Sequence, residues 1–318
     1  MLNLLRRAAP GFEVQAPGEG WTPPADAIWI DLKSPTREEE LAVEGALGLE
    51  LPTPEEMAQI EPSSRLYQES GATFMTATLL ARASEGPPVA VPVTFVLAKG
   101  LLVTIRYDEL RAFSVFAERA PQSEIASGSA ALLGLLDAIV ERLAEILERT
   151  AEGVEQASAA IFRRTPQGRG FQGLLTELAR GQSVTSTTRT SLVSLARLLS
   201  FAALASEIVA DQECKAHLKS LQRDVQSLTE HASFQSSHVA FLLDAALGLI
   251  NIEQNGIIKI FSVMAVIFMP PTLVASIYGM NFHHMPELSW RAGYPLAIGL
   301  MLISALLPVL WFRKRGWF

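Results

Sequence analysis

The sequence predicts an α+β domain, a mixed sheet with helices, followed by very long helices and by two C-terminal transmembrane helices. Three observations support this fold class. Runs of β-branched and aromatic residues, which are typical of strands, lie within residues 1–125. Between residues 126 and 256 the apolar residues recur at steps of three and four, as on one face of a helix. Residues 257–312 are strongly apolar and carry few charges.

Composition excludes some classes of protein. The chain has 318 residues, of which 49% are hydrophobic, and a mean hydropathy of +0.25, which is high for a soluble protein. The formal charge of −7 argues against a nucleic-acid partner, because no basic surface would compensate the phosphates. A single cysteine, Cys214, excludes a disulfide within the chain, and we expect a buried, inert thiol. Pro10 and Gly11 interrupt the first apolar residues, so we expect no signal peptide and a start in the cytosol.

The N-terminal region alternates predicted strands and capped helices. Strands are predicted at 27–32 (AIWIDL), at 73–81 and at 91–110, the last with a Lys-Gly turn. Capped helices are predicted at 36–48 and at 53–60, which begin at Thr36 and Thr53, with Pro54 and Glu55 opening the second.

Three long helices are predicted next. The first begins near Ala130 and carries leucine and isoleucine at helical spacing. The segment 166–173 (PQGRGFQG) separates it from a second helix over 174–209. The third begins near Glu213 and meets no proline before Pro270. We therefore expect one helix of about 50 residues or more that enters the bilayer directly from the cytosol.

Two stretches are long enough to cross a bilayer. Residues 257–278 contain a single charge, Lys259, and residues 294–312 contain none. Each has about 20 residues, which matches about 30 Å of hydrocarbon. The tail 313–318 is basic, whereas the connecting loop has one glutamate and one arginine, so the positive-inside rule places both termini in the cytosol. The predicted segments are a cytosolic α/β domain (1–125), a cytosolic helical region (126–256), a first transmembrane helix (257–278), a periplasmic loop (279–293), a second transmembrane helix (294–312) and a basic tail (313–318).

Small and polar residues share one face of the third helix and its continuation into the first span. At steps of three and four, that face holds Asp244, Asn251, Asn255, Ile258, Ser262, Ala265, Met269, Thr272 and Ser276. Such a stripe can simply allow close packing of helices in lipid. Alternatively, several copies of the helix line a water-filled axis, which requires an oligomer because two spans cannot enclose a pore. Polar groups at the cytosolic end favour the second interpretation.

The segment YGMNFHHMPELSWRAGYP (278–295) resembles the signature of the CorA family of magnesium and cobalt transporters, in its proteobacterial form. The resemblance is carried by the triplet Gly279-Met280-Asn281 at the end of the first span and by Met285-Pro286-Glu287-Leu288 in the loop. INIEQN (250–255) and AIWIDL (27–32) resemble the same family.

The resemblance implies a funnel-shaped homopentamer in the bacterial inner membrane that conducts Mg²⁺, with Co²⁺ and Ni²⁺ as further ions. It implies that Gly279, Met280 and Asn281 form the outer selectivity filter and that Glu287 lies in the periplasmic loop. Asn255, Met269 and Thr272 match pore-lining positions, and Asp244 matches a carboxylate ring at the cytosolic mouth.

The family is also regulated by Mg²⁺ bound between cytosolic domains, so the ion is both cargo and regulator, and no organic cofactor is implied. Asp224 is the candidate regulatory ligand on the long helix, although a solvated aspartate explains it equally well. Its partner ligand cannot be placed from the sequence.

Two rival functions remain open. His283 and His284 depart from the family pattern and could bind a transition metal, or could be exposed loop residues that bind nothing specific. The nearest rival is a ZntB-like zinc transporter, against which the intact MPEL argues; ion preference and proton coupling stay undecided. The second rival is a non-conducting, membrane-tethered metal sensor, which would place bulky or charged residues on the stripe.

An enzyme is not expected. His217, His231 and His238 have no cysteine or serine partner at a recognisable spacing. Gly168-x-Gly170 follows a proline rather than a strand, so it fails as a phosphate-binding loop.

Overall fold

The computed structural model places most of the chain in two compact units, Met1–Leu243 and Asp244–Phe318. It describes residues 1–7, 13–17, 20–59, 61–82, 86–120, 125–162, 171–281, 283 and 285–316. His284, Gly168 and Gly170, which were considered above, lie outside these described residues.

The first unit contains a mixed sheet, as predicted. Its described strands lie in the order β2-β1-β3-β7-β6-β5-β4, and every neighbouring pair is antiparallel except β3–β7, which is parallel. The strands are β1 (Leu2–Arg6), β2 (Glu13–Gln15), β3 (Ala27–Lys33), β4 (Leu66–Glu69), β5 (Ala72–Ala81), β6 (Val89–Ala98) and β7 (Leu101–Arg106). The predicted strands at 27–32, 73–81 and 91–110 are therefore confirmed, the last as the hairpin β6–β7.

The turn of this hairpin has the predicted chemistry. Lys99 and Gly100 both have positive φ, at 54° and 76°, which suits a two-residue turn between twisted antiparallel strands. Lys99 is held in this strained conformation while its ammonium donates a hydrogen bond of 2.8 Å to the carbonyl of Leu47.

Short helices follow the early strands. They are α1 (Arg37–Leu47), α2 (Pro54–Met57), α3 (Pro62–Arg65) and α4 (Arg111–Arg119). Thr36 and Thr53 form capping boxes with the glutamate three residues later, which confirms both predicted starts. The second helix is shorter than predicted, because α2 ends at Met57 and a separate turn, α3, begins at Pro62.

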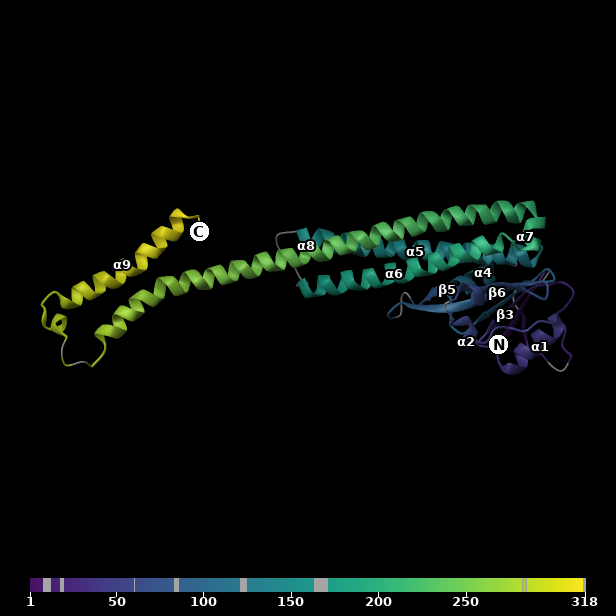
Figure 1. Cartoon of the computed structure of the whole chain (residues 1–318), viewed down its shortest axis with the longest axis horizontal. Helices are drawn as coiled ribbons and strands as arrows, with labels where there is room; N and C mark the ends of the chain where they lie inside the picture. Colours follow the sequence, from purple (N-terminus) through teal and green to yellow (C-terminus); the bar gives the residue numbers. More distant parts are fainter. Residues whose placement is uncertain are drawn as a thin grey trace. The chain divides into compact units, whose positions relative to one another are not determined.

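The sheet is covered on both faces (Figure 1). On one face Val43, Leu47 and Met57 of α1 and α2 pack on β1, β3 and β7. On the other face lie α4, α5 (Gly128–Phe162), α6 (Phe171–Ala202) and the first part of α8 (Gln212–Tyr278). Sheet and long helices thus share one core, in which each strand alternates its side chains between the two layers.

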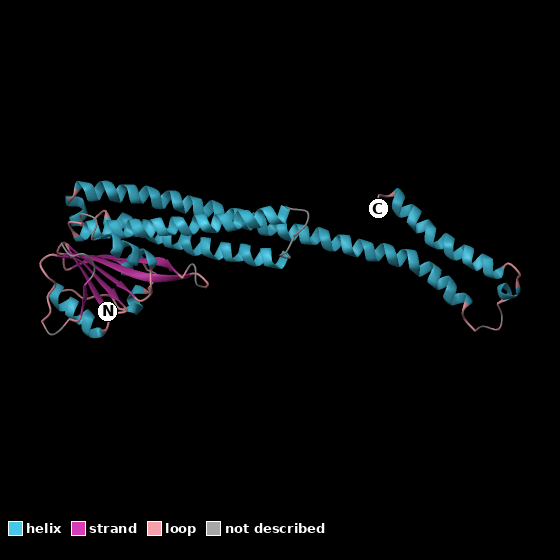
Figure 2. Cartoon of the chain, turned by 180° about the vertical axis from the view of Figure 1, so that it is seen from behind, coloured by secondary structure: helices cyan, strands magenta, loops and turns pink. Residues whose placement is uncertain are grey.

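The long helices are largely as predicted, with one correction (Figure 2). α8 is continuous over 67 residues, which confirms the very long helix. The helix predicted over 174–209 instead ends at Ala202, and a short helix, α7 (Ser206–Ala210), fills the corner before α8. α7 docks on the β6–β7 turn, where the carboxylate of Glu207 accepts a hydrogen bond of 3.0 Å from the Gly100 N–H. A 3₁₀ turn, η2 (Pro286–Ser289), and α9 (Gly293–Lys314) complete the chain.

Cys214 lies in the first turns of α8 and is 5% exposed. Burial raises the pKa of its thiol above the ordinary value. The side chain is therefore protonated near neutral pH, in agreement with the predicted inert thiol.

A buried ion pair joins β3 to β7 beneath α4. The guanidinium of Arg106 donates to both carboxylate oxygens of Asp31, with Nη2–Oδ2 at 2.8 Å and Nε–Oδ1 at 3.1 Å. The hydroxyl of Thr104 donates to the same carboxylate at 2.8 Å, and the guanidinium lies 4.6 Å from the ring centre of Phe113. Asp31 is 2% exposed and Arg106 is 5% exposed, so neither charge can be satisfied by water if its partner is removed.

Replacing Arg106 by methionine should therefore destabilise the N-terminal unit by about 3–5 kcal/mol, because Asp31 would stay buried without its cation. For a unit of this size the apparent melting temperature should fall by roughly 6–20 °C, measured by circular dichroism on the full-length protein in detergent. Arg119→Met is the matched control, because this arginine pairs with Glu141 at the surface. Adding Asp31→Asn to Arg106→Met should recover part of the loss. Equal melting of the Arg106 and Arg119 variants would contradict the assignment.

Candidate functional site

The predicted stripe is an exposed face of α8. All nine of its residues belong to the second unit and are exposed there: Asp244, Asn251, Asn255, Ile258, Ser262, Ala265, Met269, Thr272 and Ser276. Because α8 is an unbroken helix, their spacing of three and four residues places them along one side of it.

Another face of the same helix is covered within the unit. Val263 is 4% exposed, and Lys259 and Ile267, four residues to either side of it, are half-buried. At about 100° per residue this face lies well away from the stripe. The small residues of the stripe are therefore not covered within this chain, and both interpretations, packing against helices of other copies and a water-lined axis, stay open.

Both C-terminal helices are apolar and uncovered. The apolar window of α8 has a mean hydropathy of 2.1 and is 6% buried, and that of α9 has a mean hydropathy of 2.2 and is 11% buried. A core helix of a soluble protein would be buried, whereas Phe268 and Leu273 are 62% and 60% exposed. By length and composition both helices can cross a membrane.

Two adjacent prolines interrupt the hydrogen bonding of α8 inside its apolar part. Pro270 and Pro271 have no N–H to donate to the carbonyls of Val266 and Ile267 one turn earlier. The hydroxyl of Thr272 donates to the carbonyl of Phe268 at 2.7 Å. Figures 1 and 2 both show α8 changing direction shortly before its end, as expected where a helix contains proline.

The Gly-Met-Asn triplet lies directly at the C-terminal end of α8. The N–H groups of Gly279 and Met280 donate to the carbonyls of Ala275 and Ile277, at 2.9 Å and 3.3 Å, and close the last turn. A Cβ atom on Gly279 would lie 3.1 Å from the Ala275 oxygen, a tight contact that a larger residue could relieve only by a small shift. All three triplet residues are exposed. The carbonyl end of a helix carries partial negative charge, which favours a cation nearby.

The loop after the triplet folds onto the start of α9. Glu287 lies in η2 with its side chain half-buried, and its carbonyl accepts from the Trp290 N–H at 3.3 Å. A Cβ atom on Gly293 would lie only 2.3 Å from the same carbonyl oxygen, so no other residue fits without moving the loop. Sequence reasoning missed this requirement, since a single glycine before a helix carries no specific signal.

The candidate metal ligands are exposed where the structure describes them. His283 is exposed, and its neighbour His284 lies outside the described residues. Asp224 is exposed on α8, with no second ligand assigned to it. Over the described ranges of this one chain, no three His, Cys, Asp or Glu side chains are placed to hold a metal ion. The filter, the stripe, Glu287 and Asp224 thus stay predictions about the assembled protein.

Comparison with known proteins gives the family. The sequence profile of the family described as "CorA-like Mg2+ transporter protein" matches residues 24–314. The magnesium transport protein CorA of Pasteurella multocida is 38% identical over 293 residues, which cover 92% of each chain. This chain belongs to the CorA family. The CorA family is one of transporters, so the chain is not an enzyme.

Solved structures show the same fold at low identity. The complete CorA magnesium transporter from Methanocaldococcus jannaschii superposes with a TM-score of 0.77, at 18% identity, over 100% of this chain and 98% of that one. The cytoplasmic domain of ZntB from Vibrio parahaemolyticus superposes with a TM-score of 0.54, at 9% identity, over 79% of this chain and 98% of its own. CorA proteins and the ZntB domain therefore share an architecture, and the fold alone does not decide between their ions.

Proposed function

We propose that several copies of this chain form a channel that carries Mg²⁺ across the bacterial cytoplasmic membrane. One observation carries the proposal: in a CorA-family chain, an exposed stripe of small and polar residues runs along α8 and ends at an exposed Gly279-Met280-Asn281. Relatives that share more than a third of their residues with this chain are named magnesium transport proteins. Co²⁺ and Ni²⁺ are proposed as further ions.

The channel is an oligomer, because a chain with two spans cannot surround a pore. A homopentamer in lipid, as the family resemblance implies, would bring the stripes of the α8 helices around one axis. Lipid would contact the remaining apolar faces of α8 and α9. Both termini are proposed to lie in the cytosol, since the basic residues Arg313 and Lys314 end α9.

The entrance suits a hydrated ion. Mg²⁺ prefers octahedral oxygen ligands and releases its water reluctantly. A ring of Asn281 carboxamides can accept hydrogen bonds from those waters without stripping them, and the carbonyl ends of the α8 helices add negative potential. Because the ring is neutral, it holds the ion loosely enough to let it pass inward. Glu287 in the loop would add negative charge on the outer side.

The inner pathway combines an apolar constriction with polar rings. Ile258 and Met269 would form collars that exclude water when the pore narrows, and Asn255 and Thr272 would supply oxygen atoms between them. Asp244 would form a carboxylate ring toward the cytosol that concentrates cations. No ATP is needed, because a divalent ion gains about 4.6 kcal/mol per 100 mV of inside-negative potential.

Regulation is proposed through Mg²⁺ held between N-terminal units of neighbouring copies, with Asp224 as one ligand. The ion would favour a closed arrangement and its loss would free the units to open, as in any two-state switch biased by a ligand. Mg²⁺ is then both the transported and the regulatory ion.

A ZntB-like zinc transporter remains the second candidate, favoured by the shared fold of the N-terminal unit and by the exposed His283. The test is ion influx into proteoliposomes that hold an internal fluorescent indicator, with low internal Mg²⁺ and an inside-negative potential. We expect Mg²⁺ to enter rapidly, with a rate that rises with the potential and does not need a proton gradient.

Two controls make the outcome decisive. Empty liposomes measure leakage, and a second set of proteoliposomes receives Zn²⁺ with and without a proton gradient. Entry of Zn²⁺ that depends on the gradient, without entry of Mg²⁺, would replace the magnesium proposal by the zinc one. Absence of influx for both ions would favour a non-conducting sensor.

A further inference from the structure

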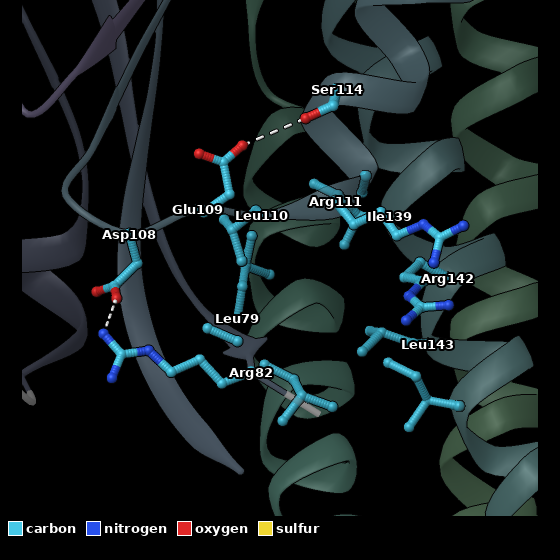
Figure 3. Close-up of a pocket in the computed structure, with 14 residues that line it drawn as sticks. Leu79, Arg82, Asp108, Glu109, Leu110, Arg111, Ser114, Ile139, Arg142 and Leu143 are labelled. Carbon is cyan, nitrogen blue, oxygen red and sulfur yellow. Dashed lines mark hydrogen bonds and ion pairs between the residues drawn. The ribbon is translucent and has the colours of Figure 1, made fainter. Parts of the chain in front are cut away.

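A pocket opens in the first unit between the end of β5, the connection from β7 to α4 and the middle of α5 (Figure 3). Its volume is about 430 Å³, which lies within the range of sites for small organic ligands. Every residue of its wall belongs to the unit Met1–Leu243, so the pocket is complete in one chain.

The wall has an apolar part and a cationic part. The apolar part is formed by aliphatic side chains that include Leu79, Leu110, Ile139 and Leu143. The cationic part is formed by Arg82, Arg111 and Arg142. This combination suits a ligand with an apolar or ring-shaped body and an anionic group, rather than a bare metal ion or a purely apolar molecule.

The two carboxylates in the wall are already engaged. Asp108 accepts a hydrogen bond of 3.0 Å from Arg82. Glu109 is paired with Lys33 and accepts a hydrogen bond of 3.3 Å from the Ser114 hydroxyl, which turns its carboxylate away from the arginine side, as Figure 3 shows. Neither carboxylate is therefore left to compensate the other arginines of the wall.

Those arginines are Arg111 on α4 and Arg142 on α5, which both line the pocket (Figure 3). Arg142 is mostly buried, with 16% of its side chain exposed, and pairs with Glu145. That same carboxylate also binds Arg149, and its pKa is lowered chiefly by the hydrogen bond from Arg142, with Arg149 and Arg111 adding to the effect. The carboxylate of Glu145 thus pairs with two arginines and feels the charge of a third, Arg111, so positive charge remains in excess at this end of the pocket.

Arg111 itself is exposed and makes no hydrogen bond or ion pair with the residues that the structure describes. It is the first residue of α4, whose N-cap, Leu110, has no side-chain hydrogen bond to the helix. A bound anion would give Arg111 a partner and would offset the excess of positive charge in this part of the wall.

We propose that this pocket binds a phosphorylated organic molecule of nucleotide size, with its phosphate on Arg111 and Arg142 and its body against the aliphatic wall. Arginine pairs recognise phosphate through forked hydrogen bonds, and the aliphatic wall sets a preference for an organic phosphate over the inorganic ion. This site is separate from the ion pathway along α8, and its existence does not depend on the proposed transport.

The test is isothermal titration calorimetry of the full-length protein in detergent, with EDTA present to remove divalent ions. ADP is the probe, and adenosine and inorganic phosphate are titrated in parallel. We expect ADP to bind more tightly than either fragment, since each fragment fills only one part of the pocket. Arg111→Gln should weaken ADP binding at least about tenfold, the usual scale for a lost charged hydrogen bond.

Arg119→Gln is the matched control, because it removes the same charge from the other end of the same helix, outside the pocket, and should leave ADP binding unchanged. Leu143→Glu gives a second variant that introduces a negative charge into the aliphatic wall and should abolish binding. Three outcomes would overturn the proposal: no heat of binding with ADP, equal binding by the wild type and Arg111→Gln, or inorganic phosphate bound as tightly as ADP.

Discussion

Replacing Ala265 by tryptophan should abolish Mg²⁺ influx into proteoliposomes. Ala265 lies in the middle of the exposed stripe on α8, four residues before Met269 and three after Ser262. If the stripes of several copies surround one axis, each copy places one indole side chain at the same height in the narrow pore. The constriction would then be filled by side chains, and influx should fall at least about a hundredfold, toward the leakage of empty liposomes.

Met264→Trp is the matched control for this variant. Met264 precedes Ala265 by one residue, so it faces about 100° around the helix, and its side chain is 48% exposed. A tryptophan there should meet lipid and leave influx within about twofold of the wild type. Size-exclusion chromatography of both variants checks that the assembly persists. If Met264→Trp blocks influx and Ala265→Trp does not, the stripe does not face the axis.

The features that the sequence predicts well depend on local chemistry. The capping boxes at Thr36 and Thr53 need only a glutamate three residues later, and the Lys99–Gly100 turn needs only two residues that accept positive φ. The continuity of α8 follows in the same way, because nothing between Asp211 and Pro270 breaks a helix. The stripe was predictable too, since helical periodicity alone places its residues on one face.

The sequence predictions fail where contacts between residues far apart in the chain determine the local structure. No glycine or proline marks the end of α6 at Ala202. The chain turns there because Ala205 and Ile208 are buried in the core and the carboxylate of Glu207 accepts a hydrogen bond from the Gly100 N–H. The strand β1 was missed because its five residues become a strand only by pairing with two later segments, β2 and β3.

The least predictable features join residues far apart in the chain. Asp31 and Arg106 are 75 residues apart and meet only because β3 and β7 are parallel neighbours. The pocket beside α4 likewise combines Leu79 on β5, Arg111 on α4 and Arg142 on α5. No spacing rule within the sequence could bring these side chains together, since their proximity is a property of the sheet order and helix packing.

Asn281→Ala should reduce Mg²⁺ influx at least about tenfold. The residue follows the last turn of α8, where its carboxamide is exposed beside the carbonyl end of the helix. In an oligomer the substitution removes one acceptor from every copy at once. Each lost hydrogen bond to an ion-bound water weakens the binding of the hydrated ion at the entrance by about 0.5–1.5 kcal/mol. The loss of two or more such bonds accounts for the reduction in influx. Influx would be measured with the same internal indicator and the same inside-negative potential.

Ser289→Ala is the control in the same loop, because this hydroxyl donates only to the Pro286 carbonyl at 2.7 Å, and its loss should leave influx nearly unchanged.

The two variants also separate two models of selectivity. If Asn281→Ala still conducts Mg²⁺ at the wild-type rate, the backbone carbonyls of Gly279 and Met280, and not the carboxamide ring, hold the hydrated ion. If it conducts poorly but gains permeability to smaller or less hydrated cations, the ring acts by matching the water shell, as the chemistry of Mg²⁺ requires.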